Sequence, residues 1–375
     1  MSHYDVSLIL LIIFLCVFGL IMIYSTSYYN ADHYYNDEGL YITRQALFFV
    51  GGLVAMILIS MIDYHVWFKE YHLFKIRKLP FRMIWILWLL CIGLQFYVWK
   101  FGYSANGSSR WIRLGALGNF QPSELTKICF VMMTAYLCVR NKKKFDTPVG
   151  FVQVIGVLAF PLFLVAKLNL SSAIIMAGIM IVICFVMSRK KWYYYICIVP
   201  VVLGGIAYFV FNEGYRAKRI VEWLHPENDP GSQIMQGLYA IASGGFFGKG
   251  LGNSVQKMGY IQEVHTDMIF TVICEEFGII GAIAVITVFL MLLLRLFKIA
   301  INSSDMLGGL IATGVFVQIA IQLVLNIAVV TNTIPATGVP LPFISYGGSS
   351  LLVLMAEMGI VLSVSKYTVE NVSEE

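Results

Sequence analysis

The chain has 375 residues, of which 59% are hydrophobic and only 13% charged, and its mean hydropathy is +0.79. Soluble domains carry about 25% charged residues, so this composition excludes a water-soluble globular enzyme, a disordered chain and a disulfide-rich secreted protein. The net charge of +5 is small for this length, which excludes nucleic acid as a partner. The remaining class is an all-α polytopic membrane protein.

The apolar segments are continuous rather than alternating, which favours transmembrane helices over a β-barrel. A bilayer core needs roughly 20 apolar residues per helix. The sequence therefore predicts ten spans, at 6–25, 44–62, 83–99, 123–139, 149–166, 171–188, 192–212, 268–294, 307–330 and 343–364. No basic residue precedes Val6, so we expect the first span to be retained rather than cleaved as a signal peptide. The seven cysteines show no C-x-x-C spacing and lie in apolar stretches, so we expect neither disulfides nor a zinc site.

Lysine and arginine mark the side of the membrane on which each loop lies. They gather in four loops, at 63–82, 140–148, 189–191 and 295–298. These loops alternate with the others, so the positive-inside rule predicts that they and both termini are cytoplasmic. The short segment 366–375 is then a cytoplasmic tail.

Two loops on the predicted outer side are basic against this rule, at 100–122 and 213–267. Basic residues on that side suggest an anionic ligand. The second loop is the longest one between spans, and long loops in compact proteins are usually functional. We therefore expect one membrane domain over 1–375, with the main site on the loop 213–267.

The first candidate cluster lies at 106–127. Pro122 and Ser123 suit a helix start, with Ser123 as the cap. Glu124 and Lys127 are three residues apart and share a helix face near the outer surface. They form either a structural ion pair or part of a functional site. Trp111 suits an interfacial anchor.

The second cluster is the glycine-rich run 244–254, which contains Lys249. Such backbone can present N–H groups to phosphate, but the run lacks the glycine spacing and the Ser or Thr of a Walker A motif. The alternative is a glycine-rich turn at the membrane edge.

The third cluster is the segment 263–267, directly before an apolar run. Asp267 either caps the following helix or acts as a general base at the outer surface, and Glu263 and His265 lie close enough in sequence to compete for that role. Glu275 and Glu276 lie deeper in the same span, so they must face protein or water rather than lipid.

Two further patterns lie near the C-terminus. Gln318, Gln322 and Asn326 recur every four residues and form a polar stripe, for which interhelical hydrogen bonds are the favoured explanation. The segment 335–350 contains three prolines and a glycine pair. Irregular backbone at this depth is tolerated where it is buried in protein or lines a cavity, so this segment indicates a site.

Five stretches together resemble the SEDS family (shape, elongation, division and sporulation) of bacterial membrane proteins. They are NGSSRWIRLG at 106–115, QPSELTK at 121–127, SGGFFGKGLGNSVQK at 243–257, EVHTD at 263–267 and PLPFISYGGSS at 340–350. The run 250–257 is similar to the division and sporulation branch, FtsW and SpoVE, more than to RodA of the elongation branch. The chain departs from the family before the sixth span, where Asn169-Leu170-Ser171 replaces the usual Asp-Leu-Gly.

The resemblance implies a peptidoglycan glycosyltransferase that serves cell division or cell shape. It would polymerise lipid II, the undecaprenyl-pyrophosphate-linked disaccharide-pentapeptide, by inverting transfer on the outer face of the bacterial cytoplasmic membrane. Asp267 would be the catalytic base. The expected substrate-binding residues are Arg110, Trp111, Arg113, Gln121, Ser123, Glu124, Lys127, Arg216, Arg219, Lys249, Lys257, Glu263, His265, Ser345, Gly347 and Gly348.

The resemblance also implies partners and bears on cofactors. A class B penicillin-binding protein would supply the transpeptidase that this chain lacks, together with other divisome or elongasome membrane proteins. No ligand cluster in the sequence requires a metal, although Mg²⁺ or Mn²⁺ could accompany the pyrophosphate. The competing hypotheses are a lipid II flippase and a non-catalytic scaffold for the transpeptidase.

Overall fold

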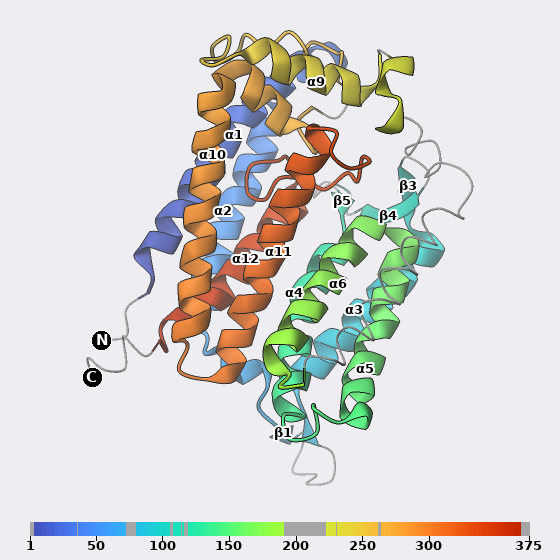
Figure 1. Cartoon of the computed structure of the whole chain (residues 1–375), viewed down its shortest axis with the longest axis vertical. Coiled ribbons are helices and arrows are strands. Elements are labelled where there is room, and N and C mark those ends of the chain that lie inside the picture. Colours follow the sequence, from blue (N-terminus) through green and yellow to red (C-terminus); the bar gives the residue numbers. More distant parts are fainter. Residues whose placement is uncertain are drawn as a thin grey trace.

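The computed structural model describes residues 4–35, 37–72, 80–105, 108–113, 115, 119–190, 223–229, 231–261 and 264–368. Within these ranges the protein is helical, with short strands at both ends of the bundle (Figure 1). The helices in the first half of the chain are α1 (Val6–Tyr35), α2 (Leu40–Met61), α3 (Met83–Phe101), α4 (Pro122–Arg140), α5 (Pro148–Leu168) and α6 (Leu170–Met187). Those in the second half are α9 (Gln233–Gly244), α10 (Ile269–Asn302), α11 (Met306–Val330) and α12 (Gly348–Ser365).

Eight helices of the described residues are long and apolar enough to cross a membrane: α1, α2, α3, α5, α6, α10, α11 and α12. They bear large exposed apolar side chains, such as Phe14 on α1, Leu47 on α2 and Leu294 on α10. Such side chains suit a lipid environment. The prediction of a polytopic helical membrane protein is therefore confirmed. The predicted span at 192–212 falls outside the described residues, and the one at 123–139 forms α4, which is not among these eight helices.

Helix α4 is the central helix of one half of the bundle. It packs against α3, α5, α6, α11 and α12, and 16 of its 19 residues are buried. Its start differs from the expectation, because Gln121 is the N-cap and Ser123 lies inside the first turn. Pro122 occupies the first helical position as predicted, where its missing N–H costs nothing. Since α4 is enclosed by other helices, Glu124 and Lys127 are buried against protein rather than exposed to lipid.

Short elements mark the two ends of the bundle. One end carries β3 (Tyr103–Ala105), β4 (Ser108–Arg113) and β5 (Asn119–Phe120), which form an antiparallel sheet, together with α9 and the 3₁₀ turn η4 (Pro226–Asn228). The opposite end carries the turn η1 (Tyr64–Trp67) and the pair β1 (Tyr71–His72) and β2 (Pro80–Phe81). Figure 1 shows α9 and β3 at the top and β1 at the bottom. The top is the predicted outer side, and the two basic outer loops meet there.

Helix α10 is broken near the outer side, a feature that the sequence pattern does not predict. Gly278 has φ +68° and ψ −166°, outside helical values. The turn 245–250 fits into the break, where Lys249 N donates to Glu275 O (2.9 Å) and Ile279 N donates to Gly245 O (3.0 Å). A Cβ at Gly278 would come within 2.4 Å of Phe246 O. The glycine-rich run is therefore a turn docked into a broken membrane helix, which is the structural alternative considered above.

Candidate active site

A cavity of about 360 Å³ opens among β4, α4, α6, α11 and the segments before α10 and α12. It combines side chains from the loop 100–122 with the end of the loop 213–267 that leads into α10. Its lining residues include seven of the predicted site residues: Arg110, Trp111, Gln121, Glu124, Lys127, Asp267 and Gly347. The sequence motifs, which are as much as 237 positions apart, therefore meet in one place.

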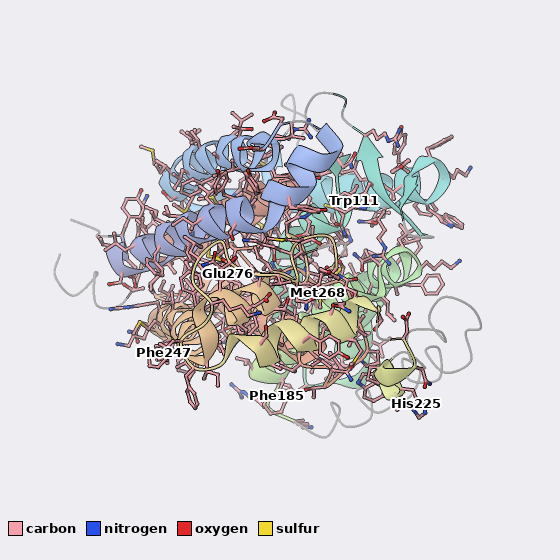
Figure 2. All side chains as sticks on the ribbon, turned by 90° about the horizontal axis from the view of Figure 1, so that it is seen from above. Trp111, Phe185, His225, Phe247, Met268 and Glu276 are labelled. Carbon is pink, nitrogen blue, oxygen red and sulfur yellow. The ribbon has the colours of Figure 1, made fainter. Side chains whose placement is uncertain are left out.

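Asp267 lies on the cavity wall, two residues before α10 begins. The N-cap of α10 is Met268, which makes no side-chain cap bond, so Asp267 is not the cap. Its backbone carbonyl accepts a hydrogen bond from Asn326 Nδ2 (2.8 Å), and its Oδ1 accepts one from Thr266 Oγ1 (3.2 Å). Figure 2 looks down on the outer end and shows the adjacent Met268 near the centre of the bundle. The carboxylate is thus held by its main chain and partly exposed to the cavity.

The opposing wall is the irregular segment between α11 and α12. Gly338 has φ +67°, and a Cβ there would lie 3.7 Å from Asp267 Oδ2. Asn326 Nδ2 also donates to Val339 O (2.8 Å). One side chain of the predicted polar stripe therefore ties this wall to the backbone of Asp267. The prediction that the proline-rich segment lines a cavity is confirmed.

The floor of the cavity carries a buried ion pair. Lys127 Nζ lies 2.9 Å from Glu124 Oε2, and Ser350 Oγ donates to the same oxygen (3.0 Å). The Lys127 side chain is only 2% exposed. The spacing-based prediction of a shared face is confirmed, and the pair brings a fixed dipole, with no net charge, beneath the cavity.

Two cationic residues of the loop 100–122 have different surroundings. Arg110 lines the cavity and donates from Nε to Leu168 O (3.1 Å). Arg113, in contrast, is exposed and stacks on the ring of Tyr103, with 3.6 Å between its guanidinium carbon and the ring centroid. Arg113 is not among the lining residues. The predicted Arg216, Arg219 and Glu263 lie outside the described residues.

The two predicted lysines of the outer loop do not line this cavity. Lys249 Nζ pairs with Glu275 Oε1 (2.7 Å), and Lys257 Nζ pairs with Glu276 Oε1 (2.8 Å). Both glutamates are almost fully buried, as expected for carboxylates that avoid lipid. The structure thus gives these lysines a different role from phosphate binding, because each one neutralises a carboxylate of α10 and holds the loop in place.

His265 belongs to an aromatic cluster behind Asp267. Its ring centroid lies 4.7 Å from that of Tyr41 and 5.4 Å from that of Tyr346, and it is 8% exposed. Nδ1 has no hydrogen-bond partner among the described residues. Burial lowers the pKa of the His265 imidazole to about 4. The ring is therefore neutral at pH 7, which suits packing better than proton transfer.

This pKa predicts a pH-dependent stability. The unfolded imidazole has a pKa of about 6.5, so between pH 6.5 and 4 the unfolded chain binds the proton more tightly. Stability should be complete above pH 6.5 and should fall by about 3 kcal/mol as the pH drops to 4. His265→Phe should remove this part of the dependence, measured as unfolding midpoints across pH in detergent. Tyr41→Phe is the control that should retain it, and an unchanged slope in His265→Phe would contradict the assignment.

The remaining predicted residues shape the site from outside the main cavity. Ser345 Oγ accepts a bond from Leu341 N (2.8 Å) and lines a small void of about 20 Å³ beside Glu124. Gly348 begins α12 against Phe48, and Ser123 Oγ accepts a bond from Gln121 Nε2 (2.9 Å).

Three polar lining residues lie outside the predicted segments: Asn169, Ser171 and Ser172. Six others lie inside those segments, although none was predicted to bind substrate: Asn119, Thr266, Gln322, Gly338, Tyr346 and Ser350. Asn169 caps α6 by accepting from Ser172 N (3.3 Å), and Ser171 Oγ donates to Thr337 O (2.5 Å). The departure from the family pattern at 169–171 was the available signal, because it placed polar residues at a membrane helix start.

The described residues contain no group of three His, Cys, Asp or Glu side chains that could hold a metal ion. Their six cysteines are free and buried.

Comparisons with known proteins identify the family to which the chain belongs. The profile of the FtsW/RodA/SpoVE family, described as "Cell cycle protein", matches residues 6–370. The chain is 36% identical to "Probable peptidoglycan glycosyltransferase FtsW" of Geobacter sp. (strain M18), covering 96% of both chains. It is 37% identical to "Stage V sporulation protein E" of Bacillus subtilis (strain 168), covering 97% of both. The protein is therefore a polytopic helical membrane protein with a polar cavity at one end of its bundle. It belongs to the FtsW/RodA/SpoVE family.

Solved structures show the same fold. The chain superposes on one from "Structural coordination of polymerization and crosslinking by a peptidoglycan synthase complex" with a TM-score of 0.77 at 23% identity, covering 99% of this chain and all of the other. It superposes on the Thermus thermophilus rod shape determining protein RodA with a TM-score of 0.70 at 23% identity, covering 98% of both.

Proposed function

We propose that this chain is a peptidoglycan glycosyltransferase that polymerises lipid II on the outer face of the bacterial cytoplasmic membrane. The observation that supports it best is Asp267, a partly exposed carboxylate in a cavity that also holds Arg110 at the outer end of the bundle. The activity in the names of relatives with 36% identity over nearly the whole chain points the same way.

The proposed chemistry assigns one task to each group. An acceptor sugar hydroxyl attacks the anomeric carbon of the donor, the bond to the lipid pyrophosphate breaks, and the configuration inverts. Asp267 takes the hydroxyl proton, an effect typically worth about 10²–10⁴ in rate. The pyrophosphate leaves with the electron pair and gathers negative charge, which Arg110 stabilises. Lys127 is already paired with Glu124, so this pair supports the cavity floor rather than neutralising the leaving group.

A divalent cation belongs to the proposal only as a companion of the substrate. With no three-ligand cluster among the described residues, Mg²⁺ or Mn²⁺ would take most of its ligands from pyrophosphate oxygens and water. Chelation with EDTA followed by addition of either ion tests this requirement.

The proposal includes orientation and a partner. The ends of α1 and α12 that adjoin the termini lie at the side opposite α9 (Figure 1), which supports cytoplasmic termini together with the positive-inside rule. The structural neighbour comes from a peptidoglycan synthase complex that coordinates polymerization with crosslinking. That coordination supports a class B penicillin-binding protein as the partner of this chain, within the divisome or elongasome.

The deciding experiment is lipid II polymerisation by the purified protein, alone and with its cognate transpeptidase. Glycan chains that form while the transpeptidase is inhibited would support the proposal. If no chains form under either condition, the polymerase proposal is wrong, and lipid II translocation in liposomes would then separate the flippase from the scaffold.

A further inference from the structure

Glu357 is a buried carboxyl group that the proposed chemistry does not use. It lies in the middle of α12, is 1% exposed, and does not line the cavity. An ionised carboxylate in such a place costs several kcal/mol unless a cation and hydrogen bonds compensate it. The surroundings of Glu357 therefore indicate which form it takes.

The cation that acts on Glu357 is Lys127, which is already paired with Glu124. Lys127 Nζ is within ion-pair distance of Glu124 (2.9 Å), and the ion pairs of the described residues include none between Lys127 and Glu357. The charged groups that act on Glu357 are Lys127, which attracts it, and Glu124, which repels it. From α2, which packs closely on α12, the buried polar residues Gln45 and Ser60 bond elsewhere, to Ser345 O and Ile57 O. Two carboxyl groups thus lie near one ammonium, and only Glu124 is paired with it.

The hydrogen bonds of Glu357 point to a missing donor. Gln318 Nε2 donates to Glu357 Oε2 (2.6 Å). The other oxygens of the same two side chains, Glu357 Oε1 and Gln318 Oε1, have no partner among the described residues. Both are acceptors if Glu357 is ionised. A single proton on Glu357 Oε1 would let the acid donate to the amide oxygen while the amide donates to the acid, which would satisfy both orphan atoms.

We propose that Glu357 carries a proton in the active protein, forms a reciprocal acid–amide pair with Gln318, and acts as a positioning residue for Lys127. The three groups Glu124, Lys127 and Glu357 then sum to zero charge. Lys127 is left wholly to Glu124, which Ser350 also holds. This role rests on the proposed function, since an uncompensated anion beneath the cavity would draw Lys127 away from Glu124 and repel an anionic pyrophosphate.

The position of the group also gives the proton a route of exchange. Gln322 lies one turn from Gln318 on α11 and lines both the cavity and the small void beside Glu124 and Leu354. That void, about 20 Å³, can hold one water molecule. Neither Glu357 nor Gln318 lines the void, but Gln322 and Leu354, each about one turn from this pair, do. A water molecule there would be the relay by which Glu357 loses its proton as the pH rises.

The test has one readout that does not depend on activity. In reconstituted wild-type protein, infrared difference spectroscopy should show the carbonyl stretch of a protonated carboxylic acid that is absent from Glu357→Gln. Gln318→Met, which removes the amide partner, should shift that band without abolishing it. If no acid band depends on Glu357, the proposal is overturned, whether or not the protein polymerises lipid II.

The second readout is the pH profile of polymerisation. Glutamine is the isostere of the protonated acid, so Glu357→Gln should stay within about threefold of wild type at neutral pH. At alkaline pH, wild type should lose activity as Glu357 ionises, and the variant should keep it. A neutral-pH loss in Glu357→Gln of more than about tenfold, with the variant folded, would mean that the ionised form is required and would overturn the proposal. A protein that shows the acid band but makes no glycan would contradict only the proposed function.

Discussion

Asp267→Asn is expected to lower kcat for lipid II polymerisation by about 10²–10⁴ with little change in KM. Asparagine has nearly the same shape but cannot take the acceptor proton. The fold should survive, because the bond from Asn326 Nδ2 goes to the backbone carbonyl of Asp267, which the substitution leaves unchanged. The measurement is steady-state glycan synthesis by purified wild type and variant at equal folded concentration.

Two comparisons make this prediction specific. Asp267→Glu retains a base but extends it by one methylene toward Gly338, where an added Cβ would lie 3.7 Å from Asp267 Oδ2. It should therefore keep more activity than Asp267→Asn. Thr266→Val removes the 3.2 Å bond to Oδ1 but keeps the carboxylate, and it should have a smaller effect than either. Equal rates for wild type and Asp267→Asn would show that the base lies elsewhere, with Glu263 as the next candidate.

The fold could be predicted from sequence because its strongest signal is local. Runs of about 20 apolar residues predict membrane helices without knowledge of their neighbours, and the eight apolar spans of the described residues follow from this signal. The ninth predicted span there, 123–139, forms the buried helix α4. The break in α10 could not be predicted, because Gly278 leaves the helix only where the turn 245–250 occupies the gap. Such a contact between distant segments leaves no periodic signal.

The site was predicted in part for the same reason. Charged residues are rare in or near membrane helices and indicate a site there. This signal predicted Arg110, Glu124, Lys127 and Asp267. Charge alone does not show whether a lysine faces a substrate or a carboxylate. Lys249 and Lys257 were predicted to bind phosphate, although Glu275 and Glu276, already identified as carboxylates needing partners, are their actual neighbours.

The second large effect concerns the stability of the outer loop. Lys257, Glu276 and Ser25 form a buried cluster in which Lys257 Nζ lies 2.8 Å from Glu276 Oε1 and 2.9 Å from Ser25 Oγ. Ser25 Oγ also donates to Glu276 Oε1 (2.7 Å). The cluster joins the loop, α10 and α1. Removing one charge from a buried pair leaves the other uncompensated, so Lys257→Met or Glu276→Leu should each cost about 3–5 kcal/mol.

The double variant separates this effect from simple loss of packing. Lys257→Met combined with Glu276→Leu leaves neither charge of this pair buried, so its cost should be well below the sum of the single costs.

Lys249→Met is the matched control, because the side chain of Lys249 is 33% exposed and Glu275 keeps bonds from Ser254 Oγ and Val255 N. Its cost should be smaller than that of Lys257→Met. The measurement is reversible unfolding in mixed micelles, and strictly additive single costs would contradict the cluster. Because the loop leads directly to Asp267, the single variants should also lose polymerase activity at temperatures where the double variant retains it.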